Sequence, residues 1–231
     1  MPLYTADALV LRTYALGEAD RLVVFLTRDR GKKRGVARSA RRPRSRFVGA
    51  LEPLTEARVA YFESARRELV GLNYAETIRS PLGLTGSAWG PSPLKLSGAA
   101  AQDGLTHVAY FAELLNEWAQ DADADERLYR LGASMLDALG AGAPAEPLAR
   151  YFEYWLLRLQ GLYPDGRESL SEGAQAFLVA ARTVAPRDIG AVPVEASAIR
   201  ELERVHRALI TMHLEKTLKS DRVLRDLRRH A

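Results

Sequence analysis

The first 79 residues alternate apolar side chains with other side chains over short segments. Leu9 and Leu11 alternate with Ala8, Val10 and Arg12, and related patterns recur at 21–27, 54–62 and 67–76. A period of two is that of a β-strand, and a further short strand is expected around 36–37. Five short strands separated by Gly and Pro, with no room for a crossover helix, predict a five-stranded OB-fold β-barrel over residues 1–79.

The pattern changes after a stretch at 80–104 that is rich in Gly, Pro, Ser and Ala, which we interpret as a linker or loosely ordered connection. From residue 105 apolar residues recur every three or four positions, which predicts helices. Four such faces can be identified, one for each predicted helix: Val108, Phe111, Leu115 and Trp118 in the first; Leu128, Leu131, Met135 and Leu139 in the second; Leu148, Phe152, Trp155 and Leu159 in the third; and Leu202, Val205, Leu209 and Met212 in the last long helix. Pro147 is placed to lie in the first turn of the third helix. Another helix is expected after a capping box formed by Ser169 and Glu172. The predicted fold is therefore α+β, with a barrel followed by an α-helical bundle of about five helices over 105–231.

Composition excludes several classes of protein. The 231 residues are 47% hydrophobic and 27% charged, which is typical of a folded globular protein. The chain has no cysteine, so disulfide frameworks and thiolate zinc sites are excluded. No apolar run approaches the roughly 18 residues of a membrane span, and the N-terminus lacks the pattern of a signal peptide, so a cytoplasmic location without membrane contact is expected.

The charge is concentrated in one run. Residues 28–46 hold ten Arg or Lys side chains and one acidic residue, Asp29, whereas the formal net charge of the chain is only +4. Arg presents a planar fork of donors that fits phosphate oxygens, and Lys adds a mobile point charge, so the run suits a polyphosphate backbone. The alternative is a solvated loop. Gly31, Gly35, Ser39, Pro43 and Ser45 interrupt the run and predicted strands flank it, which favours display on a folded rim.

These observations give a set of candidate contacts with a nucleic-acid backbone, namely Lys32, Lys33, Arg34, Arg38, Arg41, Arg42, Arg44 and Arg46. Arg21 is a weaker candidate because the neighbouring Glu18 and Asp20 could pair with it. A second basic cluster near the end of the chain comprises Lys216, Lys219, Arg222, Arg225, Arg228 and Arg229. It could extend the DNA path or receive an acidic partner tail, or its cations could simply complement the dipole of a helix C-terminus. Aromatic residues available for base stacking are Tyr14, Phe47, Tyr61, Phe62 and Tyr74, each of which suits the barrel core better.

Catalytic motifs are weak. Glu18 and Asp20 lie in a predicted turn without a companion that would support a metal-dependent nuclease. Glu203 and His206 have the spacing of a di-iron motif, but only one copy is present, and His206 is expected to flank an apolar stripe together with His213. The sequence contains no P-loop, dinucleotide fingerprint or nucleophile elbow. An ATPase or hydrolase is therefore not expected, and the motifs identify no catalytic residue and no metal site.

Three segments are similar to a known family. LGEADRLVVFLTRDRGKKRGVARSARRPRSRFVGALEPLTE resembles the N-terminal signature of the RecO family of bacterial DNA repair proteins, through Gly17-Glu18, Asp20-Arg21, Thr27, Gly31 and the arginine-rich run. YFEYWLLRLQGLYPD and HLEKTLKSDRVLRDL resemble later helices of the same family. The resemblance implies a recombination mediator that is not an enzyme. Such a mediator binds single- and double-stranded DNA, anneals complementary strands, and acts with RecR to load RecA on DNA coated by single-strand-binding protein. It also implies binding to the acidic C-terminal tail of that coating protein, and a location at the nucleoid.

The sequence departs from the family at one place. Many members carry a four-Cys zinc module after the Pro-Asp turn, but here Asp165 runs directly into GRESLSEGAQ, so the module is absent near 165–168 and no zinc is expected. Either this lineage lost the module or the sequence lacks a stretch that belongs there.

Two other functions compete with the mediator. Phosphate-directed binding does not separate DNA from RNA, so an RNA-binding OB-fold protein of translation or ribosome assembly is the alternative, and a nuclease is the third. Preference for DNA over RNA, annealing without nucleotide, and cleavage with divalent metal discriminate among them.

Overall fold

The computed structural model describes residues 1–64, 66–81, 99–164 and 170–229, except for the side chains of 99–103 and 225–229. Five strands, β1 (Leu3–Leu16), β2 (Asp20–Thr27), β3 (Gly31–Ala37), β4 (Glu56–Phe62) and β5 (Val70–Arg79), close into a barrel in the order β1-β2-β3-β5-β4. Neighbouring strands are antiparallel except β3 and β5, which pair in parallel. The barrel followed by helices confirms the predicted fold class.

Both faces of the first two strands are buried, against different partners. In β1, Ala8 and Val10 point into the barrel, whereas Leu9 and Leu11 belong to a core shared with the helices. β2 repeats this division, with Val23 and Phe25 inside the barrel and Val24 and Leu26 in the shared core. The near-continuous apolar character of these strands follows from this double burial, because adjacent strand residues point to opposite faces.

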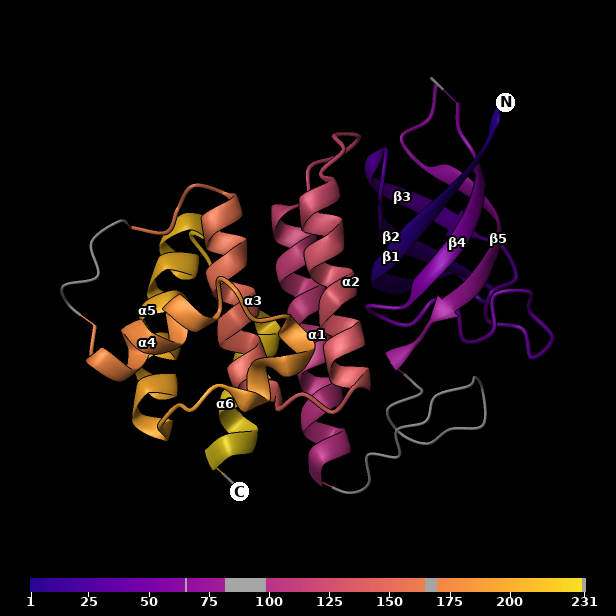
Figure 1. The fold of residues 1–231 in the computed structure, drawn as a ribbon. Coiled ribbons are helices and arrows are strands. Elements are labelled where there is room, and N and C mark those ends of the chain that lie inside the picture. Colours follow the sequence, from indigo (N-terminus) through magenta and orange to yellow (C-terminus); the bar gives the residue numbers. More distant parts are fainter. Residues whose placement is uncertain (65, 82–98, 165–169, 230–231) are drawn as a thin grey trace.

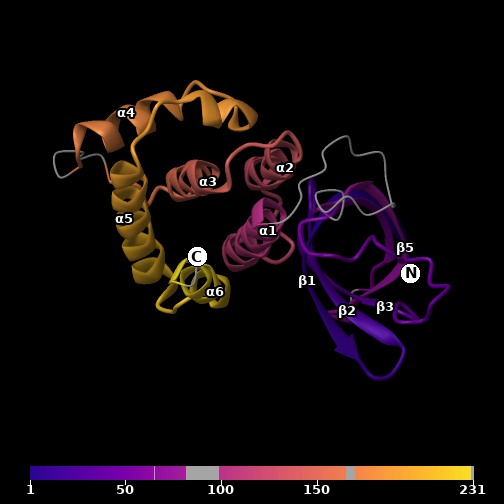
Figure 2. The same ribbon diagram turned by 90° about the horizontal axis from the view of Figure 1, so that it is seen from below.

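In the described part of the chain, six α-helices and one 3₁₀-helix follow the barrel: α1 (Ala99–Trp118), α2 (Glu126–Gly140), α3 (Ala145–Leu159), α4 (Glu172–Ala180), η2 (Pro186–Ala191), α5 (Ala196–Leu214) and α6 (Lys219–Arg229). Figures 1 and 2 show α1 and α2 standing between the barrel and the remaining helices, with α4 and α5 on the far side. None of the helices that the structure describes is long and apolar enough to cross a membrane.

The predicted helix faces agree with the observed core in the first three helices, where their members are buried or half-buried. In α5 the predicted stripe is wrong at Met212, which is 73% exposed. The buried side of α5 instead follows Ile199, Leu202, His206 and Ile210. A histidine can occupy that face because a buried carboxylate pairs with it, as described below. Pro147 lies in the first turn of α3, as predicted.

The helix starts also differ in detail from the predictions. Ser171, and not Ser169, caps α4: its hydroxyl accepts from the Ala174 N–H at 3.3 Å. Ser169 lies outside the described residues, as does most of the predicted linker at 80–104. The first helix begins at Ala99, six residues before the expected start of the helical region.

Backbone contacts hold the barrel against the bundle. At the start of β3, Lys32 donates its N–H to the Gln120 carbonyl at 3.0 Å and accepts from the Ala122 N–H at 3.1 Å, in the loop between α1 and α2. Gly31 adopts φ +66°, and a Cβ there would lie 2.3 Å from the Asp123 carbonyl oxygen. The close approach of two backbones therefore requires glycine at this position.

Candidate nucleic-acid interface

The connection between β3 and β4 carries five of the predicted DNA contacts, and we call residues 38–46 the arginine loop. Its start is fixed to the turn between β1 and β2. Asp20 accepts the Ser39 N–H at 2.7 Å, while Arg41 donates its backbone N–H to Ala19 and its guanidinium to the Gly17 carbonyl, both at 2.9 Å. Ser39 has φ +58°, an uncommon conformation that the Asp20 carboxylate stabilises by this bond. The loop is thus held by the residues of the LGEADR segment.

Two of the predicted DNA-binding residues, both on β3, have side chains that are hydrogen-bonded to other groups of the protein. The Lys32 ammonium donates to the Asn116 carbonyl at 2.9 Å, and the Lys33 ammonium donates to Glu63 at 2.7 Å. Both lysine side chains are only 12% exposed. Their charges are therefore partly used in tying β3 to α1 and to the end of β4.

Arg34 and Arg21 each lie near one carboxylate of the protein itself. Arg34 is 55% exposed and lies 3.5 Å from Asp121. Arg21 lies 3.9 Å from Glu52, so its nearest carboxylate partner is neither Glu18 nor Asp20, which corrects the pairing expected from the sequence. Asp20 is engaged with Ser39, and Glu18 is exposed in the turn.

The charges of the other arginines of the arginine loop are available to a ligand. Arg38, Arg42, Arg44 and Arg46 are exposed, and no carboxylate of the described residues lies within 4.0 Å of any of them. Arg46 also lies over the Phe47 ring, 5.2 Å from its centroid. An exposed guanidinium without an ion-pair partner keeps its donors available for phosphate oxygens, with little internal interaction to break.

The aromatic residues divide between core and surface. Phe47 and Tyr61 are buried at 2% and 0% exposure, as expected of barrel core. Tyr14 and Phe62 are 46% and 37% exposed, so the prediction of a core position is wrong for these two. Tyr14 lies near the tip of the β1–β2 hairpin, and Phe62 ends β4, where the barrel no longer covers the side chain.

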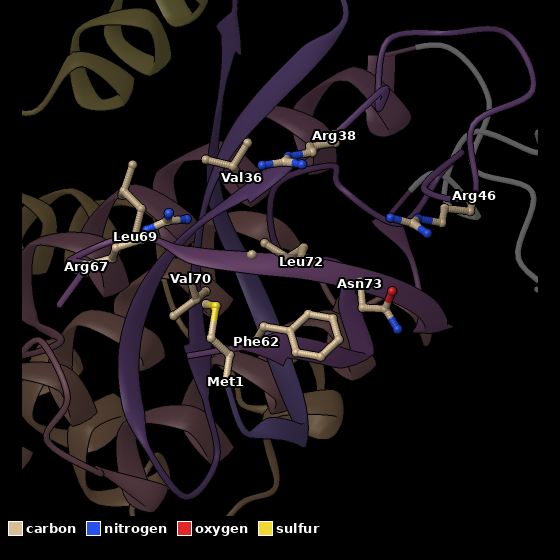
Figure 3. Close-up of a pocket in the computed structure, with 11 residues that line it drawn as sticks. Met1, Val36, Arg38, Arg46, Phe62, Arg67, Leu69, Val70, Leu72 and Asn73 are labelled. Atoms are coloured by element: carbon tan, nitrogen blue, oxygen red, sulfur yellow. The ribbon is translucent and has the colours of Figure 1, made fainter. Parts of the chain in front are cut away.

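Sequence reasoning missed two cations beside this surface. Arg66 and Arg67 lie in the connection between β4 and β5 and are both exposed. Arg67, together with Arg38 and Arg46, lines a pocket of about 460 Å³ (Figure 3). The adjacent arginine pair could have been noticed in the sequence, but its proximity to the arginine loop depends on barrel closure.

The second basic cluster surrounds α6. Lys216 follows Glu215, the C-cap residue of α5, and pairs with Glu117, so the dipole interpretation stays open for it. Lys219 begins α6 and does not lie at a helix C-terminus. Arg222 is exposed. The side chains of Arg225, Arg228 and Arg229 lie outside the described part of the chain.

A buried polar network occupies the bundle. Glu153 of α3 accepts from the Tyr110 hydroxyl at 2.6 Å and from Arg150 at 2.8 Å, and its other oxygen lies 3.0 Å from His206 Nδ1. Burial acts against the charge, but Arg150 and these hydrogen bonds hold the pKa of Glu153 below its ordinary value. His206 thus lies in the core and does not flank the stripe. The network joins α1, α3 and α5.

The described residues contain no group of three or more His, Asp or Glu side chains placed to share a metal ion. The position near 165–168, at which the sequence led us to expect no zinc module, lies outside those residues.

Comparison with known proteins gives consistent matches. The family models described as Recombination protein O N terminal and Recombination protein O C terminal match residues 1–81 and 102–183. The DNA repair protein RecO of Koribacter versatilis is 40% identical over 160 residues, which cover 69% of this chain and 59% of the relative. Its counterpart from Anaeromyxobacter sp. (strain K) is 38% identical over 155 residues, 67% of this chain and 56% of the relative. The matches thus span less than two thirds of these relatives' lengths.

Proposed function

Because the chain belongs to the RecO family of DNA repair proteins, we propose that it is a DNA-binding recombination mediator whose working surface is the arginine loop. The observation that carries this proposal is that four exposed arginines on a loop anchored by Asp20 have no carboxylate partner among the described residues, namely Arg38, Arg42, Arg44 and Arg46. Such a surface would neutralise phosphates and release counterions, so that binding is tight, salt-sensitive and tolerant of sequence.

The proposal extends to annealing of complementary strands. Two polyanionic strands repel each other, and a cationic loop that binds both reduces this repulsion while the base edges remain free to pair. The activity needs no catalytic residue, metal or other cofactor. It would operate in the cytoplasm, at the nucleoid.

The partners proposed are single- and double-stranded DNA, RecR, and the C-terminal tail of single-strand-binding protein, with RecA loaded indirectly. Family membership supports these protein partners. The exposed cations Lys219 and Arg222 offer a second surface that could extend the DNA path or receive the acidic tail.

The test is binding of a labelled single strand at several salt concentrations, for the wild type and for a variant with Arg38, Arg42, Arg44 and Arg46 changed to Gln. Removing one phosphate-binding arginine should lower the slope of log K against log salt by about 0.7, and removing all four by about 2.8 if each binds a phosphate. Annealing of complementary oligonucleotides should slow in the same variant.

A matched control removes the same charge from the bundle, through Gln at the exposed residues Arg130, Arg187, Arg200 and Arg204. It should retain the slope and the annealing rate. Equal reductions in both variants would mean that net charge, not the loop, governs binding, and an unchanged slope in the loop variant would refute the proposal. Tighter binding of RNA than of DNA would favour the RNA-binding alternative, and cleavage with divalent metal the nuclease.

A further inference from the structure

The pocket beside the arginine loop combines an apolar floor with a cationic rim. It encloses about 460 Å³ and is lined by residues from β3, the end of β4, the start of β5 and the loops next to them. In Figure 3, Arg38, Arg46 and Arg67 stand on three sides of Val70, Leu72 and Phe62. The volume falls in the range of roughly 300–1,000 Å³ that is usual for small-molecule sites.

Part of the apolar floor of the pocket is exposed to solvent. Val70 and Leu72 are almost fully buried by the barrel, but Phe62 and Leu69 remain 37% and 39% exposed at the pocket. Phe62 pairs with Gly71 on β5, and the absence of a side chain at Gly71 leaves the surface beside the ring open. An exposed aromatic face of this kind is a suitable stacking platform for a flat ligand.

The rim selects for an anion. None of the described residues that line the pocket is acidic, and no carboxylate of the described residues lies within 4.0 Å of Arg38, Arg46 or Arg67. A ligand that satisfies both parts must therefore carry a flat apolar face and a negative charge next to it.

We propose that this pocket takes one unpaired nucleotide of a bound strand, with its base against Phe62 and Leu69 and the adjacent phosphates on Arg38, Arg46 and Arg67. The inference rests on the proposed function. Arg38 and Arg46 belong to both the pocket and the arginine loop, so a strand whose phosphates lie on the loop brings its bases within reach of the floor. A paired base is stacked on both faces within a duplex and cannot enter, and the pocket would thereby favour single strands.

The experiment compares a labelled oligothymidylate with a strand of the same length in which every base is replaced by an abasic site. The two carry the same phosphates, so loop contacts are equal and the comparison isolates the base. We expect the wild type to bind the abasic strand at least about fivefold more weakly, since stacking of one base contributes roughly that much or more.

Variants then locate the effect. Phe62→Ala should bring the two affinities close together while the salt slope stays that of the wild type. Ile78→Ala serves as the control, because Ile78 is 45% exposed on β5 and does not line the pocket. The Ile78→Ala variant should keep the difference in affinity between the oligothymidylate and the abasic strand. Far-ultraviolet circular dichroism and urea unfolding verify that each variant is folded.

The outcomes separate this inference from the proposed function. Equal binding of both strands by the wild type, with reduced affinity in the loop variant, would refute the pocket and leave the DNA-binding function intact. A base-dependent difference that survives Phe62→Ala would place stacking elsewhere and also refute it. Failure to bind either strand would refute both. Capture of an acidic peptide with an apolar end, dependent on Phe62 and without base preference, would assign the pocket to a protein partner instead.

Discussion

Glu113 in α1 accepts hydrogen bonds from both the backbone N–H and the hydroxyl of Ser220 in the first turn of α6, at 2.8 and 2.5 Å. Its other oxygen lies 2.9 Å from the Arg12 guanidinium on β1. One buried carboxylate therefore caps a helix that is distant in sequence and joins that helix to the barrel. This is an N-cap supplied by another helix.

Replacing Glu113 by Gln should lower the free energy of unfolding by about 1–3 kcal/mol, because the amide can present only one acceptor oxygen where the carboxylate presents two. Urea unfolding measures the change. Glu117→Gln is the matched control on the same helix, since Glu117 pairs with the exposed Lys216, and its cost should be smaller. Equal costs would contradict the capping role.

The same carboxylate predicts a dependence on pH. Burial favours the protonated form of Glu113, but bonds from Ser220 and Lys219 and the charge of Arg12 outweigh it and keep its pKa below the ordinary value. A depressed pKa in the folded state means that the stabilisation is complete above the unfolded pKa, about 4.3, and is lost as pH falls through the folded value. The stability difference between the wild type and Glu113→Gln should narrow below about pH 4 in urea unfolding. A stability difference that stays constant down to pH 3 would contradict a stabilising role for the ionised Glu113 carboxylate.

The buried ion pair between Arg150 and Glu153 predicts that removing one of its charges destabilises the protein more than removing both. Glu153→Gln leaves the Arg150 charge buried at 2% exposure, with only the more distant carboxylate of Glu203 at 3.7 Å, and should lower the free energy of unfolding by about 3–5 kcal/mol. The double variant Arg150→Met with Glu153→Gln should be less destabilised, because the buried Arg150 charge is removed as well. Chemical denaturation of both proteins is the measurement, and a double variant less stable than the single one would show that the network is stabilising as a whole.

Two glycines with the same backbone conformation test the contact between barrel and bundle. Gly17 and Gly31 have φ values of +61° and +66°, but only at Gly31 would a Cβ meet backbone atoms, those of Asp123. Gly17→Ala should cost about 1–2 kcal/mol from conformation alone. Gly31→Ala should cost clearly more, since the α1–α2 loop must move. Thermal or urea unfolding of the two variants compares them, and similar costs would mean that the loop yields easily.

Asp20 is expected to act as a positioning residue for the arginine loop. Asp20→Asn removes the charge but keeps an acceptor for the Ser39 N–H, whereas Asp20→Ala removes both. Single-strand affinity should therefore be several-fold lower for the Ala variant than for the Asn variant, in line with a net hydrogen bond of about 1 kcal/mol. Fluorescence anisotropy with one labelled strand measures both. Identical affinities would show that the loop does not depend on this bond.

Much of the architecture follows from local pattern. The period of two over the first strands predicts the barrel, and the three-and-four spacing of residues such as Phe111 and Leu115 predicts the helical faces, because burial on one side of an element imposes its repeat on the sequence. The density of Arg and Lys at 28–46 likewise identifies the cationic segment without a structure.

Local pattern does not specify which of those cations remain free. Lys33 is paired with Glu63, 30 residues away, and Lys32 with the Asn116 carbonyl, 84 residues away, whereas Arg42 and Arg44 have no carboxylate partner among the described residues. His206 is a similar case, since its burial depends on Glu153 in another helix. The sequence by itself determined the elements and the basic segment; the tertiary structure decided which charges face solvent, because ion pairs and burial depend on contacts between residues far apart in the chain.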